Sequence, residues 1–271
     1  MGFEAMQETD YSTRDSNHIT ILYQGRRVVI PSLGAVAAHR AALRGRLARD
    51  ARARWGGMSV YIQGEGAALP IEASPYQQGR LGPRANLMQM LHAAERLLVL
   101  GEPGVGKTIA LERFAWELCQ REASTVPVLI RLFHYSGDSL LVWVRATLQA
   151  TGKLHFDDES ALADFLSVSE TRCVFLFDGL NEVPPDYCDR LVGELVRWMD
   201  TYPQHAVVLT SRVQDEMWRL LRDKVSQAVV VQPISDAQVL AYLESHLGQR
   251  GTMLYERLDG RIRAMARNPL L

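Results

Sequence analysis

The most regular pattern in the chain lies between residues 85 and 233, where short apolar runs alternate with longer segments of mixed polarity. The apolar runs cover residues 97–100, 126–132, 173–177, 206–210 and 228–231. The segments around them have apolar residues at helical spacing, at 85–96, 107–121, 139–150, 161–166 and 186–199. Strands that are apolar on both faces and separated by helices are typical of a parallel sheet covered on both sides. The pattern predicts an α/β fold with a five-stranded, mainly parallel sheet flanked by helices.

The residues before this pattern are less regular. Residues 19–23 and 27–30 flank a glycine turn and predict a hairpin, residues 58–62 suggest a strand, and 63–82 read as a loop rich in Gly, Pro and Gln. A helix is predicted over 36–55, with an apolar stripe on one side and six arginines elsewhere. The stripe consists of Val36, Leu43, Leu47, Ala51 and Trp55.

No strand pattern returns after residue 233. Ser235 is placed to cap a helix that ends near residue 247, and a second helix is predicted over 255–267. We therefore expect three parts: an N-terminal region of hairpin, basic helix and linker (1–82), a nucleotide-binding domain (83–233) and a small helical domain (234–271).

Composition removes several alternatives. The chain of 271 residues has 30 Lys and Arg against 31 Asp and Glu, so net charge gives no reason to expect nucleic acid or a membrane as partner. The N-terminus lacks the apolar stretch of a signal peptide, and no run is long enough to span a membrane, which predicts a cytoplasmic protein. The three cysteines, Cys119, Cys173 and Cys188, form no CxxC pair and are expected to be buried apolar side chains.

The chemistry is concentrated in the octet Gly-Glu-Pro-Gly-Val-Gly-Lys-Thr at 101–108, which matches the phosphate-loop pattern GxxxxGK[ST] at every fixed position. An apolar strand precedes it and an amphipathic helix follows. Glycines allow the backbone to wrap closely around phosphate oxygens, while Lys107 contacts the β- and γ-phosphates and Thr108 holds Mg²⁺. The residues expected to bind nucleotide here are Gly101, Glu102, Pro103, Gly104, Val105, Gly106, Lys107, Thr108 and Ile109.

A second acidic site follows the apolar run 173–177. Asp178 stands at the carboxyl end of this strand, where ligands bind in open α/β sheets, and is expected to hold Mg²⁺. Glu182 follows four residues later and is placed to polarise the attacking water. Two simpler interpretations stay open: Asp178 could cap a turn with Gly179, and Glu182 could be an exposed loop carboxylate.

The sequence Phe-Asp-Gly-Leu-Asn-Glu-Val at 177–183 resembles the extended Walker B motif of NACHT NTPases, members of the STAND class of signalling ATPases. The segment Leu-Thr-Ser-Arg at 209–212 resembles the sensor-1 segment of that family, with Arg212 near the γ-phosphate. The terminal Asn-Pro-Leu-Leu resembles the family's turn in which Pro269 lies against adenine. The resemblance covers residues 96–271, and it further implies ATP and ADP as ligands, Mg²⁺, slow hydrolysis, and a switch that controls self-association in bacterial signalling or defence.

Two departures from the family pattern matter. Asn181 stands where the family has an acidic residue, which removes a carboxylate and is expected to slow hydrolysis. The chain also stops where the family continues into a winged-helix domain, so we expect a fragment containing the nucleotide-binding domain and the first helical domain. The sensor ligand and the effector are not identifiable from these residues.

Several residues bear on other possible functions. Guanine recognition of the Ras type needs Asn-Lys-x-Asp, and neither Lys153 nor Lys224 lies in such a context, so ATP is favoured. Gly179 replaces the Glu that ring-forming AAA+ ATPases have after their Walker B Asp. The alternative is a nucleic-acid-stimulated ATPase motor, which rests on the basic helix alone; a solvated basic face or a docking surface explains that helix as well. A small-molecule kinase has no acceptor signature. Arg212 could be a surface residue, and His134, His155 and His205 are expected in loops or at the surface.

Overall fold

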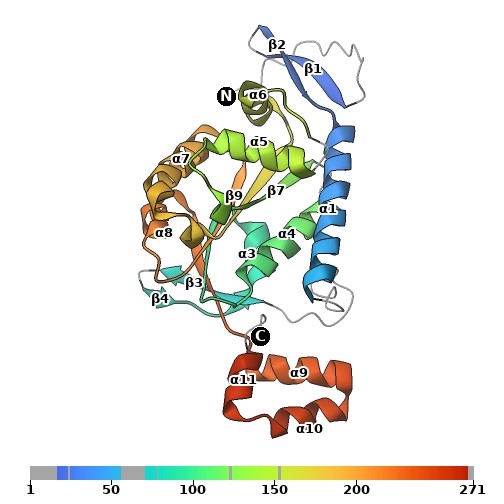
Figure 1. The fold of residues 1–271 in the computed structure, drawn as a ribbon, viewed down its shortest axis with the longest axis vertical. Coiled ribbons are helices and arrows are strands. Elements are labelled where there is room, and N and C mark those ends of the chain that lie inside the picture. Colours follow the sequence, from blue (N-terminus) through green and yellow to red (C-terminus); the bar gives the residue numbers. More distant parts are fainter. Residues whose placement is uncertain are drawn as a thin grey trace.

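The computed structural model describes residues 17–23, 25–55, 71–77, 79–121, 124–151 and 154–267. Its central feature is an eight-stranded sheet in which five parallel strands run in the order β10-β6-β9-β8-β7 (Figure 1). The parallel strands are β6 (Arg96–Leu100), β7 (Thr125–Arg131), β8 (Arg172–Asp178), β9 (Ala206–Ser211) and β10 (Gln227–Val231). They coincide with the five apolar runs, so the predicted fold class is confirmed.

Helices cover both faces of this sheet. One core lies against α3 (Leu87–Ala93), α4 (Lys107–Arg121) and the middle of α1 (Leu33–Trp55). The other lies against α5 (Leu140–Thr151), α6 (Glu159–Val168), α7 (Cys188–Thr201) and α8 (Met217–Leu220). In β6, Leu97 and Val99 belong to the core beneath α3 and α4, and Leu98 and Leu100 belong to the core beneath α5 and α7. Because successive strand residues point to opposite faces, both sets must be apolar, which explains the unbroken runs.

The N-terminal hairpin and basic helix form as predicted. Strands β1 (His18–Tyr23) and β2 (Arg26–Pro31) pair antiparallel, and Arg26 of the hairpin forms an ion pair with Asp164 of α6. Helix α1 then packs against α4 and α5 and lies across their ends (Figure 1). The described members of its apolar stripe are all buried: Val36, Leu43, Leu47 and Ala51.

The expectation that all arginines of α1 lie on a solvated face is wrong for Arg40. Arg40 is only 8% exposed, and its guanidinium donates to the carbonyls of Leu118 (3.1 Å) and Cys119 (2.9 Å) in the last turn of α4. A cation at a helix C-terminus satisfies carbonyls that have no partner within the helix. Arg40 therefore belongs to the packing of α1 on α4, while Arg44 and Arg49 stay exposed.

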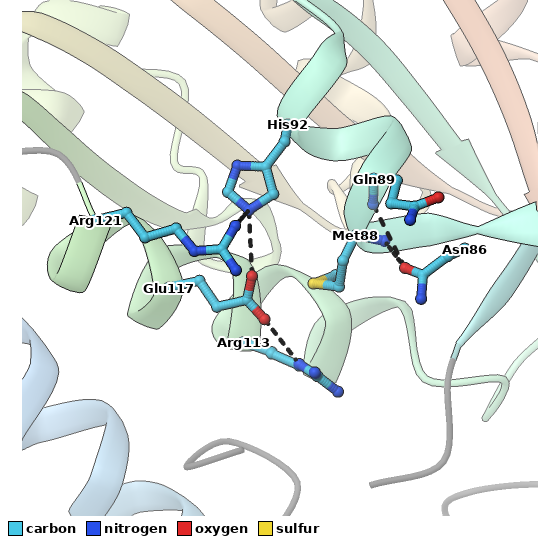
Figure 2. A network of polar contacts seen from close by, with 7 residues as sticks. All are labelled: Asn86, Met88, Gln89, His92, Arg113, Glu117 and Arg121. Atoms are coloured by element: carbon cyan, nitrogen blue, oxygen red, sulfur yellow. Dashed lines mark hydrogen bonds and ion pairs between the residues drawn. The ribbon is translucent and has the colours of Figure 1, made fainter.

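The predicted helix over 85–96 is wrong at both ends. Ala85–Asn86 form strand β5, and the helix α3 covers only Leu87–Ala93. The Asn86 side chain accepts hydrogen bonds from the backbone N–H groups of Met88 and Gln89 and so starts the helix (Figure 2). Asparagine is a preferred N-cap because its short side chain reaches these unpaired donors.

A polar network ties α3 to α4, the helix that follows the phosphate loop (Figure 2). Glu117 accepts from Arg113 at 3.1 Å and lies 3.2 Å from the imidazole of His92, which in turn lies 3.3 Å from Arg121. The His92 ring also packs edge-on against Phe114 at 4.9 Å between ring centroids. These contacts fix the orientation of α4 at the surface of the domain.

The predicted loop over 63–82 is also wrong where the structure describes it. Strand β3 (Glu72–Gln77) pairs antiparallel with β10, and β4 (Arg80–Leu81) and β5 pair with β3. The run Glu-Ala-Ser-Pro-Tyr-Gln has no alternation, and Pro75 is unusual in a strand. Pairing with β10 overrides this weak propensity. The domain boundaries at residues 82 and 233 stay predictions.

The C-terminal part consists of three short helices that follow β10: α9 (Asp236–Leu247), α10 (Gln249–Arg257) and α11 (Gly260–Ala266) (Figure 1). Ser235 caps α9 in a capping box with Gln238, as the sequence indicated. The single helix predicted over 255–267 is wrong, because Asp259 caps a new helix by accepting from the N–H groups of Arg261 and Ile262. Short 3₁₀ segments complete the fold at Leu132–His134, Leu180–Glu182, Pro185–Tyr187 and Arg222–Lys224.

His205 corrects a further expectation, because its side chain is buried at 3% exposure. Its Nδ1 accepts from the backbone N–H of Cys173 at 3.3 Å, and its Nε2 lies 3.0 Å from the carbonyl of Leu166. Nδ1 must be unprotonated to accept, so the imidazole is held in its neutral form. Cys119 and Cys173 are buried as expected, while Cys188 is half-buried.

Two buried histidines predict a loss of stability in mild acid. Burial, and to a smaller extent a nearby arginine, lowers the pKa of each of His39 and His205 from 6.5 to about 4. Between those values the unfolded chain binds protons that the folded chain does not. Stability is therefore fully present above pH 6.5 and falls as the pH drops towards 4, by up to ~1.4 kcal/mol per pH unit for each histidine.

Urea unfolding between pH 7 and 4.5 measures this slope. His205→Asn is expected to make the slope shallower, whereas the same change at the exposed His155 leaves it as in the wild type. A wild-type slope in His205→Asn would contradict the assignment.

Some predictions fall outside the described residues, namely the strand at 58–62, the place of Trp55 in the apolar stripe, and Pro269. In the part of the chain that the structure covers, no helix is both long and apolar enough to cross a membrane.

Candidate nucleotide-binding site

The loop between β6 and α4 has the shape that phosphate binding requires. Gly104 and Gly106 have φ angles of 82° and 96°, which glycine adopts without strain. Gly101 is needed for space: a Cβ there would lie 2.8 Å from Cγ2 of Val105, which is closer than side chains approach. The three glycines are thus required for different reasons. Gly104 and Gly106 are required for their positive φ angles, which the sequence analysis suggested for all three, and Gly101 is required for space.

Lys107 is the first residue of α4, and its ammonium turns back over the loop. Nζ donates to the carbonyls of Gly101 (2.7 Å) and Glu102 (3.0 Å). Burial lowers the pKa of Lys107; Asp178 opposes this shift, and Arg212 adds to it. The ammonium therefore lies close to both the acidic strand end and Arg212, where it can neutralise a phosphate oxygen.

Asp178 is held in place by the neighbouring strand. It ends β8 at 9% exposure, and Thr210 of β9 donates its hydroxyl to Asp178 Oδ1 at 2.7 Å. The same hydroxyl oxygen accepts from the backbone N–H of Gly179 at 2.7 Å. Strand β9 lies between β6 and β8, so Thr210 connects the acidic strand end to the strand that leads into the phosphate loop. Asp178 is thus fixed by a hydrogen-bond chain, which is more than the turn cap considered as an alternative.

Glu182 owes its position to Gly179. The backbone of Gly179 has φ 83°, and a Cβ there would lie 3.0 Å from Oε2 of Glu182. The N–H of Glu182 donates to the carbonyl of Gly179 at 2.9 Å, which closes the 3₁₀ turn Leu180–Glu182. Glycine at 179 therefore leaves room for the Glu182 side chain, which lines the same cavity as Asp178 and is exposed to solvent.

These residues surround one cavity of about 170 Å³. It is lined by Pro103, Gly104, Gly106, Lys107, Thr108, Ile109, Asp178, Gly179, Asn181, Glu182, Thr210 and Arg212. The cavity thus brings together Lys107, Asp178, Glu182 and Arg212, while Gly101, Glu102 and Val105 form the loop behind its lining. Its volume is below the roughly 300 Å³ of a complete small-ligand site, so it has room for part of a nucleotide, such as its phosphates, and not for the whole molecule.

The donor atoms in the cavity fit magnesium. The Thr108 hydroxyl and the Asp178 carboxylate are both oxygen ligands, which this ion prefers, and it commonly completes its shell with phosphate and water. A larger cavity of about 490 Å³ lies elsewhere, beside α1. The smaller one is the better nucleotide site, because it alone contains the phosphate-loop lysine and the acidic strand end.

A family model of the NACHT domain matches residues 95–250, more than half of the 271 residues. The chain belongs to the NACHT domain family. It is therefore a nucleotide-binding P-loop NTPase domain, as the resemblance of residues 177–183 suggested. Comparison with curated proteins gives no match.

Several solved structures resemble this NACHT domain. Cdc6p of Pyrobaculum aerophilum is 16% identical with a TM-score of 0.41, covering 62% of this chain and 48% of its own. A Walker-type ATPase of Pyrococcus abyssi is 18% identical with a TM-score of 0.45, and the match covers 67% of this chain and 63% of that one. The Drosophila ORC, solved bound to DNA, is 19% identical with a TM-score of 0.46, and the match covers 68% of this chain and 51% of that one. The chain thus spans less than two thirds of the length of these proteins, and likeness at this level concerns the fold and not what they bind.

Sequence reasoning missed two contacts of the NACHT site. Thr210 was part of the sensor-1 resemblance but was given no role, although a hydroxyl residue at the end of the strand beside Asp178 is a usable signal. Gln214 donates to Glu102 at 2.6 Å and joins the phosphate loop to the segment after β9. No sequence signal points to that contact, because the two residues are 112 positions apart.

Thr210→Val is expected to weaken the site while keeping its volume. The change leaves the buried N–H of Gly179 and one oxygen of Asp178 without their partner, which costs about 1–3 kcal/mol of unfolding free energy. It also frees the carboxylate to rotate, so Mg-dependent nucleotide affinity should fall about tenfold. Calorimetry with Mg-ADP and urea unfolding measure the two effects. Thr210→Ser keeps the hydroxyl and should restore both; a valine variant with wild-type affinity would remove Thr210 from the site.

Proposed function

We propose that this NACHT domain is an ATP- and ADP-binding switch that hydrolyses ATP slowly and controls self-association. The observation that carries the proposal is the convergence of Lys107, Thr108, Asp178, Glu182 and Arg212 on one cavity. This set contains a phosphate counter-charge, oxygen ligands for Mg²⁺, a carboxylate for water and a second cation. It is the set of groups that phosphoryl transfer to water needs.

Each residue has a defined part in the proposed reaction. Lys107 exchanges its two loop carbonyls for oxygens of the β- and γ-phosphates, and Arg212 neutralises charge that develops on the γ-phosphate. Thr108 and Asp178 would hold Mg²⁺, which would supply positive charge that stabilises the reacting phosphates. Glu182 orients the attacking water and accepts its proton. Pro269 is proposed to contact the adenine from beyond the described residues.

Slow turnover follows from Asn181. This residue lines the cavity beside Glu182, and its neutral amide stands where a second carboxylate occurs in the family pattern. With one carboxylate to handle the proton, we expect each ATP to persist long enough for its bound state to matter. The bound nucleotide then determines which conformation the protein adopts, and its hydrolysis does not drive repeated mechanical steps.

The helical segment α9–α11 is the proposed moving part. It is tied together by an ion pair between Arg267 and Asp236 and joins the sheet through residues 232–234, where the N–H of Ile234 donates to the carbonyl of Arg267. This link follows the carboxyl end of β10, the end of the parallel sheet at which the phosphate loop also lies. Rotation about the link would bring the helices towards the nucleotide or away from it.

Such a switch has an energetic requirement. We call the form with the helices near the nucleotide closed and the form with the helices away from it open. To change the ratio of open to closed protein from 1:99 to 99:1, ATP and ADP must differ by about 5.5 kcal/mol in their preference for the two forms. We propose that the open form self-associates, in the cytoplasm, in bacterial signalling or defence. The burial of Arg40 removes one of the arginines on which the nucleic-acid motor rests.

Sedimentation of the full-length protein tests this proposal. With its sensor engaged, the protein should be monomeric with ADP and oligomeric with a non-hydrolysable ATP analogue. Lys107→Ala should stay monomeric in both. Identical masses of the wild type under both conditions would refute the switch, and strong stimulation of hydrolysis by DNA or RNA would favour the motor instead.

A further inference from the structure

A cavity larger than the one at the phosphate loop lies elsewhere in the described part of the chain. It has a volume of about 490 Å³ and lies between α1, α4, the edge strand β7 and α5. Figure 1 shows α1 upright beside the ends of α4 and α5, and α1 contacts both helices and β7. A volume of this size lies within the range of small-molecule sites. We propose that it binds a small zwitterion of the aromatic amino-acid type.

The charges that line the cavity favour a ligand without net charge. Besides His134, its described lining contains two arginines and two carboxylates. Arg131 and Glu112 neutralise one another through a 2.7 Å ion pair, and Glu112 is 1% exposed. Because removing Arg131 from Glu112 would leave a buried carboxylate without this cation, the pair is costly to separate and forms a fixed part of the wall.

The other pair of charges has no partner among the described residues. Arg46 and Asp50 are four residues apart on α1, and both line the cavity. Residues at this spacing are neighbours on a helix surface, yet neither side chain forms a hydrogen bond or ion pair with another residue that the structure describes. A cation and a carboxylate held a helical turn apart match a ligand that carries a carboxylate and an ammonium group.

The remaining lining accounts for the aromatic part of the ligand. Leu47 and Leu129 are buried apolar side chains of the cavity wall, and Trp143 adds an indole surface. The Trp143 ring packs against Tyr135 with 5.9 Å between ring centroids, which holds it in place. A flat ring can lie against such a surface and gain contact at little cost in side-chain freedom.

The place of the cavity gives a bound ligand contact with the nucleotide-binding machinery. Glu112 belongs to α4, the helix that begins at Lys107. Arg131 ends β7 and stands opposite Asp178 in the register of β7 and β8. A ligand in the cavity would therefore rest on the helix that begins at Lys107 and on β7, the strand that pairs with the Asp178 strand β8.

Three related ligands test the proposal on the whole chain: L-phenylalanine, 3-phenylpropionate, which lacks the ammonium group, and 2-phenylethylamine, which lacks the carboxylate. Calorimetry or ligand-observed NMR should show that L-phenylalanine binds about tenfold more tightly than either analogue, because each charged group adds a charge-assisted contact. Equal affinities for the three, or no binding of L-phenylalanine, would overturn the proposal.

Two variants assign the contacts. Arg46→Gln should bind L-phenylalanine no better than 2-phenylethylamine, and Asp50→Asn should bind it no better than 3-phenylpropionate. Arg49→Gln removes the same charge from an exposed position of the same helix and should bind as the wild type does. Thermal unfolding confirms that the variants fold. An Arg49→Gln effect as large as that of Arg46→Gln would show a general charge effect and overturn the assignment.

Discussion

Replacing Lys107 by alanine is expected to abolish nucleotide binding or nearly so. Lys107 is the only lysine that lines the cavity; its ammonium donates to the carbonyls of Gly101 and Glu102 and is attracted by the carboxylate of Asp178. Charge-assisted hydrogen bonds contribute about 1.5–3 kcal/mol each, so the loss of two phosphate contacts should weaken binding at least about a hundredfold. Calorimetry with Mg-ATP and Mg-ADP measures the loss directly.

Lys224→Ala is the matched control for this result. Lys224 also carries an ammonium in an ion pair, at 2.8 Å from Asp200, but the pair lies at the surface after α8. Its removal should leave nucleotide affinity unchanged, since a surface ion pair contributes little to stability and neither Lys224 nor Asp200 lines the cavity. Wild-type affinity in Lys107→Ala would mean that the loop of 101–108 does not bind phosphate.

The parallel strands could be predicted from the sequence because burial on both faces leaves an unbroken apolar run. In β8, every residue from Cys173 to Phe177 is buried, and the pattern alone located it. Strand β3 carries no such signal. It contains Pro75, and only its pairing with β10, about 150 residues later, makes it a strand. Helix ends were missed for a similar reason: Asn86 and Asp259 cap helices that the apolar periodicity had extended.

The site was predictable where chemistry dictates residue type at fixed spacing. Lys107 and Asp178 follow from a loop and a strand end, and the structure places both at one cavity. What could not be predicted is the contact between strands that are separate in sequence. Thr210 reaches Asp178 because β9 lies beside β8, and strand order is a property of the fold. The burial of His205 likewise depends on Leu166 and Cys173, which lie far from it in the chain.

Glu182→Gln is expected to separate binding from hydrolysis. The amide has the shape of the carboxylate and can keep the packing over Gly179, but it cannot accept the proton of the attacking water. Loss of a general base costs about a hundredfold to ten-thousandfold in rate. Affinity for Mg-ATP should stay near that of the wild type, because Lys107, Thr108 and Asp178 are unchanged. Single-turnover hydrolysis and calorimetry on the same sample measure the two quantities.

The outcome also decides between a base and a loop carboxylate at residue 182. Glu216→Gln makes the same chemical change at an exposed position before α8 and should hydrolyse ATP as the wild type does. Wild-type turnover in Glu182→Gln would return Glu182 to the loop-carboxylate interpretation. If affinity falls together with turnover, Glu182 contributes to binding the ion or the phosphates. Retained affinity with lost turnover is the result that the switch requires, because a chain locked with ATP should then stay in its self-associating form.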